Sequence, residues 1–540
     1  MRSLSTTFLY AAALAILAIC LFPLVSVVAA SLTGVSSSVW GLIETVLPGY
    51  ALNTAGLVIC TGIGALIIGV STAWLVTMTR FPGRRILEIG LVLPFAFPAY
   101  VLAYAYTHLL DHPGIVQSTL RSTFDWGPRD YWFPEIRSFG GAAAMLILVL
   151  YPYVYLLARA SFVSQSNAQF IAARTLGRGP WRTFLTVSLP MTRTAALGGA
   201  LLVAMETIAD FGTVAFFGVP TFATGIYQSW FSMGDRAAAA QLSLCLLSFA
   251  VLLAVLERVT RNTDILSHGK KREVMARFEL KGPAAAGAIA VCGLPVVLGA
   301  VLPAGALLAM ATRSEQNLLS ARYLDFAQNS ALLAGVGAAL TVAAAIALAG
   351  ARRARPSPVT RSALQAARLG YAVPGGVIAV GLMVPAAAFD NAFDAMMRET
   401  FGISTGLLIT GSIALLVAAY MTRFLAAAIA AHEGGEASVS PNMDHAARVL
   451  GSSPLSAIVR VHAPLLAPSL LTATLIVFVD IMKELPATLI LRPFNFDTLA
   501  VQAFRLASDE RLTGAAVPSL VIAGIGLIPT ILLCRRIGRE

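Results

Sequence analysis

Charged residues are scarce in this chain of 540 residues. Asp, Glu, Lys and Arg together make up 12% of it, whereas apolar residues make up 57%. Soluble domains carry about a quarter charged residues, so charge this sparse cannot cover a water-facing surface. The same numbers exclude disorder, which needs low hydrophobicity. Most of the chain is therefore predicted to face lipid or other membrane helices.

The sequence also lacks the common motifs of metal sites and enzymes. Its five cysteines lie in apolar segments without CxxC spacing, and its six histidines are scattered. This pattern predicts neither a disulfide framework nor a metal site. GxxxxGK[ST] and HExxH are absent as well. We therefore expect no catalytic residue and no cofactor bound by this chain. A polytopic membrane enzyme is disfavoured because no asymmetric catalytic cluster is present.

Twelve apolar runs are long enough to cross a bilayer, which takes about 20 residues. The runs of the first half are 8–30, 54–78, 86–110, 139–158, 194–217 and 237–256. Those of the second half are 284–310, 329–350, 369–389, 403–422, 465–488 and 513–534. The predicted fold class is an all-α membrane protein of about 12 transmembrane helices.

The distribution of Lys and Arg predicts that both termini are cytoplasmic, because cytoplasmic loops are enriched in these residues. With the N-terminus inside, the inner segments hold 27 basic residues and the outer ones 10, while Lys483 falls within a span. Run 8–30 could be a signal peptide, but its length and the lack of a polar stop favour a retained anchor. The basic stretch 257–282 is interpreted as a solvated cytoplasmic linker rather than a nucleic-acid or lipid-specific site.

The chain contains an internal repeat. Asn53 and Asn329 open equivalent spans at an offset of 276 residues, and Pro98 and Pro374 share that offset. Two homologous six-helix halves are therefore predicted. The expected segments are 1–50 (leading helix and outer loop), 51–256 (first unit of the repeat), 257–283 (basic cytoplasmic linker), 284–328 (leading helix of the second half), 329–534 (second unit of the repeat) and 535–540 (cytoplasmic tail).

The strongest internal match lies in the cytoplasmic loops after the fourth and tenth spans, at an offset of 274 residues. Ser166 and Ser440 are favourable N-caps, and Pro441 suits a first helical turn. Gly177 and Gly451 stand where a helix should stop. Each loop is therefore predicted to form a short helix. Two such loops at matching positions indicate a docking element rather than a connector.

Both loops read A-A-x-x-x-G with L-P or A-P thirteen residues after the glycine. This pattern resembles the EAA loop of permeases in binding-protein-dependent ABC importers, with Ile171 and His445 in place of the family's glutamate. The resemblance implies a type I importer permease whose loops dock on a cytosolic ATPase. The coupling residues it implies are Ala172, Ala173, Arg174, Gly177, Pro190, Ala446, Ala447, Arg448, Gly451 and Pro464.

Segments 209–230 and 477–504 look like fused permeases of the ferric-iron importer group. That resemblance implies transport of ferric iron across a bacterial inner membrane by alternating access. It also implies two copies of an ATPase that uses ATP, and a periplasmic binding protein, with no nucleic acid as partner. Thiamine or another small solute is the alternative substrate. An ion-coupled secondary transporter is the rival from another class.

Charged residues inside the predicted spans are functional candidates, because they are costly in lipid. Glu206 and Asp210 are spaced i, i+4, as are Asp480 and Glu484, and the pairs are related by the 274-residue offset. The carboxylates could give a hard cation a transient foothold, since such cations prefer oxygen ligands. They could instead form a gate with Lys483, or lie at helix ends and meet water.

Tyrosines cluster in the third and fourth spans, namely Tyr100, Tyr104, Tyr106, Tyr151, Tyr153 and Tyr155. We interpret them as interfacial aromatic belts rather than as ligands. The outer segment 111–137 carries Trp126, Tyr131 and Trp132 among charges. It could contact a binding protein or anchor the chain at the lipid headgroups.

Overall fold

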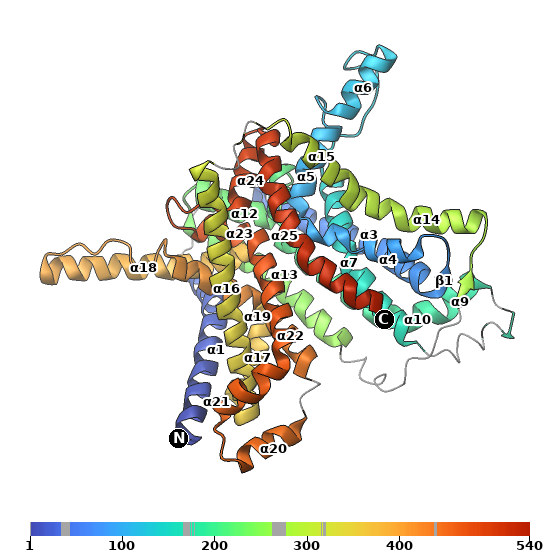
Figure 1. Cartoon of the computed structure of the whole chain (residues 1–540). Helices are drawn as coiled ribbons and strands as arrows, with labels where there is room; N and C mark the ends of the chain where they lie inside the picture. The colour runs from blue at the N-terminus through green and yellow to red at the C-terminus, as the bar shows by residue number, and fades with distance from the viewer. Residues whose placement is uncertain are drawn as a thin grey trace. The chain divides into compact units, whose positions relative to one another are not determined.

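A computed structural model of the chain describes residues 2–33, 41, 44–165, 173, 175–177, 179–261, 277–314, 316, 320–436 and 440–539 (Figure 1). Within these ranges, eleven helices are long and apolar enough to cross a membrane. A pair of segments bent by 96°, Arg84–Ala96 and Ala99–Phe124, makes a twelfth if it counts as one span. The predicted all-α membrane fold of about 12 spans is confirmed.

The elements are named as in Figure 1. Up to the linker they are α1 (Arg2–Thr33), α3 (Leu47–Met78), β1 (Thr79–Arg80), α4 (Arg84–Gly90), η1 (Leu93–Ala96), α5 (Ala99–Leu110), α6 (Ile115–Phe124), α7 (Phe139–Ser164), α9 (Pro180–Thr183), η2 (Phe184–Ser188), α10 (Leu189–Ala209), α11 (Gly212–Phe216), α12 (Phe222–Tyr227), η3 (Gln228–Ser232) and α13 (Arg236–Arg261).

After the linker they are β2 (Phe278–Glu279), α14 (Pro283–Val296), η4 (Val297–Val301), α15 (Leu302–Ala311), α16 (Ala321–Ala354), α17 (Pro358–Gly370), α18 (Gly375–Phe401), α19 (Ile413–Glu436), α20 (Pro441–Val449), α21 (Pro454–Ala457), η5 (Ile458–His462), α22 (Ala463–Lys483), α23 (Pro486–Leu491), α24 (Leu499–Ser508) and α25 (Leu512–Arg539). η1 is a 3₁₀ turn, and η2 to η5 are π-helical turns.

Serine caps begin several of the long helices. The hydroxyl of Ser138 accepts a hydrogen bond from the Gly141 amide at the start of α7, and Ser320 does the same for Tyr323 in α16. Ser357 forms a capping box with Thr360 at the start of α17. These bonds satisfy amides that the first turn of a helix leaves without partners.

The helices form two compact units that do not follow chain order. Unit 1 comprises 1–48, 222–251 and 317–502, and unit 2 comprises 49–221, 252–316 and 503–540. Helix α1 of the first half thus belongs with α16 to α19 of the second, and α14 and α15 belong with α4 and α5 of the first. The two compact units are not the two halves of the repeat. They therefore do not test the segment bounds predicted from the repeat, which stay predictions.

Proline shapes the contact of the leading helix α1 within unit 1. Pro23 has no N–H, so the carbonyl of Ile19, four residues earlier, has no partner in its own helix. The Thr422 hydroxyl of α19 donates to that carbonyl at 3.2 Å. Nearby, Gly381 of α18 lies against the Pro23 backbone so closely that a Cβ there would overlap it.

The second leading helix has a similar arrangement within unit 2. In the π-turn η4 a carbonyl accepts from the residue five positions on. For Leu298 that residue is Pro303, which has no N–H. The Tyr106 hydroxyl of α5 donates to the Leu298 carbonyl at 2.6 Å. Buried hydroxyls from the receiving unit thus satisfy backbone groups that prolines free in both leading helices.

Several predicted spans are shorter or shifted. The fifth was expected to run to 217 but ends at Ala209, and the eleventh was expected to run to 488 but ends at Lys483. The tenth, expected over 403–422, is α19 over Ile413–Glu436. This shift moves Arg423 from a predicted cytoplasmic loop into the span. The predicted span was ended before Arg423 because a charge is unfavourable in lipid. In the structure Arg423 has a carboxylate partner, Glu484, inside the bundle.

Candidate coupling and translocation sites

Helix α20 is the predicted short helix of the second coupling loop. Ser440 caps it, accepting a hydrogen bond from the Asn442 amide at 3.3 Å. At its other end Gly451 has a φ of 83°, and the Ser452 amide donates to the Ala447 carbonyl at 2.9 Å. That bond and the left-handed glycine together form a Schellman motif. The local structure predicted for this loop is confirmed.

The first coupling loop lies mostly outside the described residues, including Ala172 and Arg174. Its described residues match the second loop. Gly177 has a φ of 72°. Ala173 and Ala447, at equivalent positions, are both buried, whereas Ala446 is exposed. Arg448 lies in α20, and the structure describes its backbone only.

The same π-helical elbow follows both loops. The turns η2 and η5 begin at residues 184 and 458, which differ by 274. Each leads directly into a long helix that carries Pro190 or Pro464 in its first turn. A proline at this position costs no intrahelical bond. The two elbows therefore connect each loop to a membrane helix with the same local geometry.

Asp210 ends α10 and caps the next short helix. Its carboxylate accepts hydrogen bonds from the amides of Thr213 and Val214 at 3.1 and 3.2 Å, and from the Thr213 hydroxyl at 2.9 Å. It is the residue after the helix, with a ψ of 129°. Asp210 thus stabilises a break between α10 and α11 in unit 2.

Glu484 performs the equivalent role in unit 1. Its carboxylate accepts from the amides of Ala487 and Thr488 at 3.0 and 3.1 Å and from the Thr488 hydroxyl at 2.9 Å. It differs from Asp210 in having a cationic partner, because Arg423 of α19 donates to it at 3.2 Å. The exposed fractions of these two side chains are 2% for Glu484 and 13% for Arg423. Sequence reasoning missed Arg423, although a basic residue at the edge of an apolar run was a usable signal.

The other three candidates lie at the same helix ends. Glu206 and Asp480 lie four residues before the capping carboxylates, and Lys483 is the last residue of α22; all three are half-buried. The structure thus brings each predicted pair to a helix break in its own unit. Within the described residues, no group of three or more His, Cys, Asp or Glu is arranged to hold a metal ion.

The tyrosines of the third and fourth spans are buried, so the belt interpretation is wrong for most of them. Tyr104, Tyr151 and Tyr155 have no exposed surface. The hydroxyl of Tyr151 donates to the Leu91 carbonyl at 2.8 Å, and that of Tyr155 donates to the Glu88 carbonyl at 2.9 Å. These carbonyls lie in the last turn of α4 and directly after it, so the two tyrosines hold the end of α4 before the bend.

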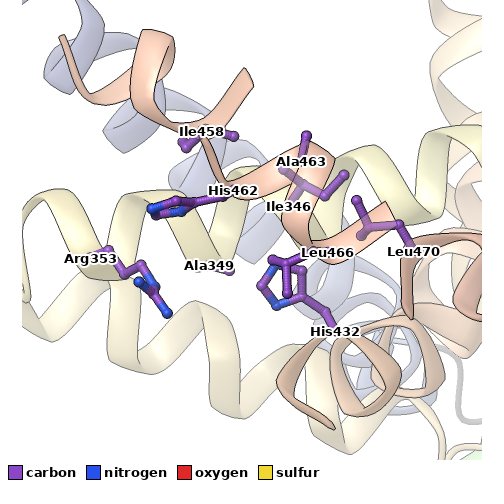
Figure 2. Close-up of a pocket in the computed structure, with 10 residues that line it drawn as sticks. Ile346, Ala349, Arg353, His432, Ile458, His462, Ala463, Leu466 and Leu470 are labelled. Carbon is purple, nitrogen blue, oxygen red and sulfur yellow. The ribbon is translucent and has the colours of Figure 1, made fainter. Parts of the chain in front are cut away.

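A small pocket lies at the elbow of unit 1 (Figure 2). His462 of η5, His432 of α19 and Arg353 of α16 line it together with aliphatic side chains, around about 270 Å³ of empty space that is partly open. Arg353 also forms an ion pair with Glu436 at 2.5 Å. Both imidazoles are buried. The pocket places polar side chains beside the turn that leads from the second coupling loop into α22.

The outer segment 111–137 folds into α6 and a stacked aromatic cluster. The rings of Phe124 and Trp126 stack at 4.7 Å between centroids, and those of Trp126 and Tyr131 at 5.4 Å. Trp132 is 86% exposed. Both functions predicted for this segment, partner contact and headgroup anchoring, need such an exposed ring and stay predictions.

An ion-pair cluster ties the end of this segment to the loop before α25 within unit 2. Arg137 forms two hydrogen bonds with Glu510, at 2.6 and 2.8 Å, and one with Asp111 at 3.1 Å. The hydrogen bond from Arg137 holds the pKa of Glu510 below its ordinary value.

Residues 63–263 match the family of binding-protein-dependent transport system inner membrane components. The Fe(3+)-transport system permease protein FbpB 2 of Haemophilus influenzae is 25% identical over 528 residues, 96% of each chain. The molybdenum transport system permease protein ModB of Escherichia coli is 28% identical over 195 residues, covering 35% of this chain and 81% of its own. The sulfate transport system permease protein CysW of Escherichia coli is 27% identical over 213 residues, covering 37% and 69%.

The repeated EAA-like loops, the eleven to twelve spans and these matches agree. Proteins of this family are transport permeases rather than enzymes. They are multi-pass proteins of the bacterial inner membrane. Residues 63–263 are therefore a binding-protein-dependent transport permease domain, and the chain as a whole resembles a fused two-half permease of an ABC importer.

Proposed function

We propose that this permease imports ferric iron, taking it from a periplasmic binding protein and releasing it into the cytoplasm by alternating access. The observation that carries the proposal is the extent of the match to the Fe(3+) permease, which covers 96% of both chains and hence both halves. The molybdenum and sulfate permeases match about a third of this chain. Their shorter matches support the permease class but not their own substrates.

ATP hydrolysis is proposed to occur on a separate ATPase, with two copies docking on the loops at 166–177 and 440–451. The capped helix α20 and the paired elbows support this role. A movement of α20 reaches α22 through the elbow η5, and the same elbow follows the first loop. Closure of the ATPases would draw the loops together and rock the two halves, as in other transporters built from related bundles. No cofactor is proposed for this chain.

The intramembrane charges are proposed to line or gate the pathway, in two classes. Asp210 and Glu484 set the helix breaks, since their oxygens are engaged by amides. Glu206 in unit 2 and Asp480 in unit 1 are half-buried and lie four residues before these caps, so we propose them as the candidates to meet a cation or to gate, with Lys483 of unit 1 as a further gate residue. Glu206→Gln with Asp480→Asn should therefore slow uptake without lowering expression. Unchanged uptake would assign these residues to the helix ends alone.

The substrate is tested by uptake in a strain that lacks this gene, with and without the intact gene. Labelled ferric iron, thiamine and molybdate are run in parallel, and the ATPase gene is then removed. Iron uptake that needs both genes would support the proposal. Restored thiamine or molybdate uptake, with no iron uptake, would reject iron but keep the permease. Uptake that survives loss of the ATPase and follows an ion gradient would favour a secondary transporter instead.

A further inference from the structure

Unit 2 contains a concentration of arginines at one membrane boundary, here called the basic corner. It consists of Arg80, Arg84, Arg85, Arg159 and Arg277. Arg80 lies in the short gap between the span that ends at Met78 and the bent span that begins at Arg84, and Arg84 and Arg85 open that bent span, so all three lie at the membrane surface. Strand β2 brings Arg277 to the same place by pairing with β1 in parallel.

Glu88 is the carboxylate that these arginines share. Arg84 donates to it at 3.1 Å, and Arg159 donates to it at 2.8 and 3.0 Å. Arg277 instead donates to the Thr77 carbonyl at 3.0 Å. Burial lowers the pKa of Arg277, and the positive charges of Arg84, Arg80 and Arg159 lower it further against the opposing effect of Glu88. Glu279 lies opposite Arg80 in the strand pair and forms an ion pair with Lys281 at 3.6 Å. The five arginines and Lys281 outnumber Glu88 and Glu279, which leaves an excess of positive charge.

Two of the five arginines carry that excess to the surface. The side chains of Arg80 and Arg85 are exposed, and no hydrogen bond or ion pair holds them within the described part of the chain. Directly after Arg85, α4 exposes two apolar side chains, Ile86 at 77% and Ile89 at 40%. Exposed isoleucines next to free guanidinium groups match a surface that is half in the acyl region and half among headgroups.

The equivalent place in the second half has more acid. Glu433, which stands where Arg159 stands in the first half, pairs with Arg368 of α17 at 2.8 Å and with Arg352 at 3.5 Å. Glu436 pairs with Arg352 and Arg353. In the first half the acid lies on the short helix α4 and the arginine on α7. In the second half the arginine lies on the short helix α17 and the acid on α19, which also carries a second carboxylate. The basic corner is a property of the first half.

We infer that the basic corner binds the phosphate headgroup of an anionic phospholipid, with Arg80 and Arg85 on the phosphate and Ile86 and Ile89 against the acyl chains. A phosphate would neutralise charge that Glu88 leaves unbalanced, and guanidinium groups bind phosphate oxygens well. The exposed isoleucines favour a lipid over free phosphate, which has no apolar part. The predicted orientation places this corner in the inner leaflet. The inference does not depend on the transported substrate.

The test titrates the detergent-purified full-length chain with phosphatidylglycerol, phosphatidylcholine or inorganic phosphate and follows its apparent melting temperature. Near an anionic surface each Arg contributes a factor of about five to affinity, so Arg80→Gln with Arg85→Gln should weaken phosphatidylglycerol binding about 30-fold. Both side chains are exposed, so the variant should fold. Arg361→Gln, an exposed arginine of α17 in the second half, is the matched control and should bind like the wild type.

Stabilisation by phosphatidylglycerol that the double variant loses and Arg361→Gln keeps would support the inference. Equal affinity in all three proteins would overturn it, since the lipid would then bind elsewhere. Stabilisation by inorganic phosphate alone would also overturn it, in favour of a soluble anion site. So would a double variant that binds lipid normally but no longer co-purifies with the ATPase, because the corner would then dock a protein.

Discussion

Replacing Glu484 by Gln should destabilise the permease far more than replacing Asp210 by Asn, although the two residues are equivalent in the repeat. Both carboxylates cap a short helix, and a neutral amide keeps an acceptor for the amides. Asn caps a helix about as well as Asp, so Asp210→Asn should cost at most about 1 kcal/mol. Glu484→Gln also strips Arg423 of its charge partner inside the bundle. Removing one member of a buried ion pair costs about 3–5 kcal/mol.

The difference is large enough to measure as a melting temperature. For domains of this size about 1 kcal/mol shifts the midpoint by roughly 2–4 °C, so Glu484→Gln should lower it by roughly 6 °C or more. Fluorescence-detected size exclusion after heating the detergent-purified chain is a suitable assay. Arg423→Met added to Glu484→Gln should recover part of the loss, because it removes the unpaired charge. Equal shifts for Glu484→Gln and Asp210→Asn, or no recovery, would refute the reasoning.

Four further perturbations test other parts of the structure. Gly451→Asp should abolish uptake at normal expression, because φ is 83° there and a carboxylate is unfavourable at a helix C-terminus, while the neutral Gly451→Asn should retain more; normal uptake by the Asp variant would contradict the coupling role. Gly381→Ala should cost about 1–3 kcal/mol through overlap with the Pro23 backbone, whereas Gly335→Ala, which meets open space, should be neutral in the same melting assay. The Glu510–Arg137 pair should stabilise the chain above the ordinary carboxyl pKa of about 4.3 and lose its effect as pH falls through the lower native pKa of Glu510; a melting-temperature gap between wild type and Glu510→Gln that persists at acid pH would argue against it. A reporter fused after residue 270 should read cytoplasmic, and a periplasmic signal would overturn the predicted orientation.

Helices, spans and the α20 caps could be predicted from sequence because they depend on local patterns. Ser440 and Gly451 carry the start and the stop of that helix in their own chemistry. For Asp210 and Glu484 a position at helix ends was only one of three readings, and the predicted spans ran past both residues, because averaged hydropathy runs through a single charge. The tyrosines of the bent span were misjudged for a related reason. A tyrosine hydroxyl can bind a lipid headgroup or a backbone carbonyl that has no partner in its own helix. Only the tertiary structure decides which of the two it meets.

The partner of each leading helix could not be predicted at all. Hydropathy records that α1 is apolar, and it says nothing about which helices cover it. The ion pair of Arg423 was missed on the same ground, since its carboxylate lies 61 residues away in sequence. Such contacts are fixed by tertiary packing rather than by any local pattern.

The placement of the leading helices constrains the order in which the protein can be built. Helix α1 is synthesised before its neighbours α16 to α19, which are made some 300 residues later. Until then the Ile19 carbonyl lacks the hydrogen bond that the Thr422 hydroxyl donates. Unit 1 therefore cannot be completed while the chain is half synthesised. Unit 2 takes its last segment from residues 503–540, so both units are completed only when nearly the whole chain has been inserted.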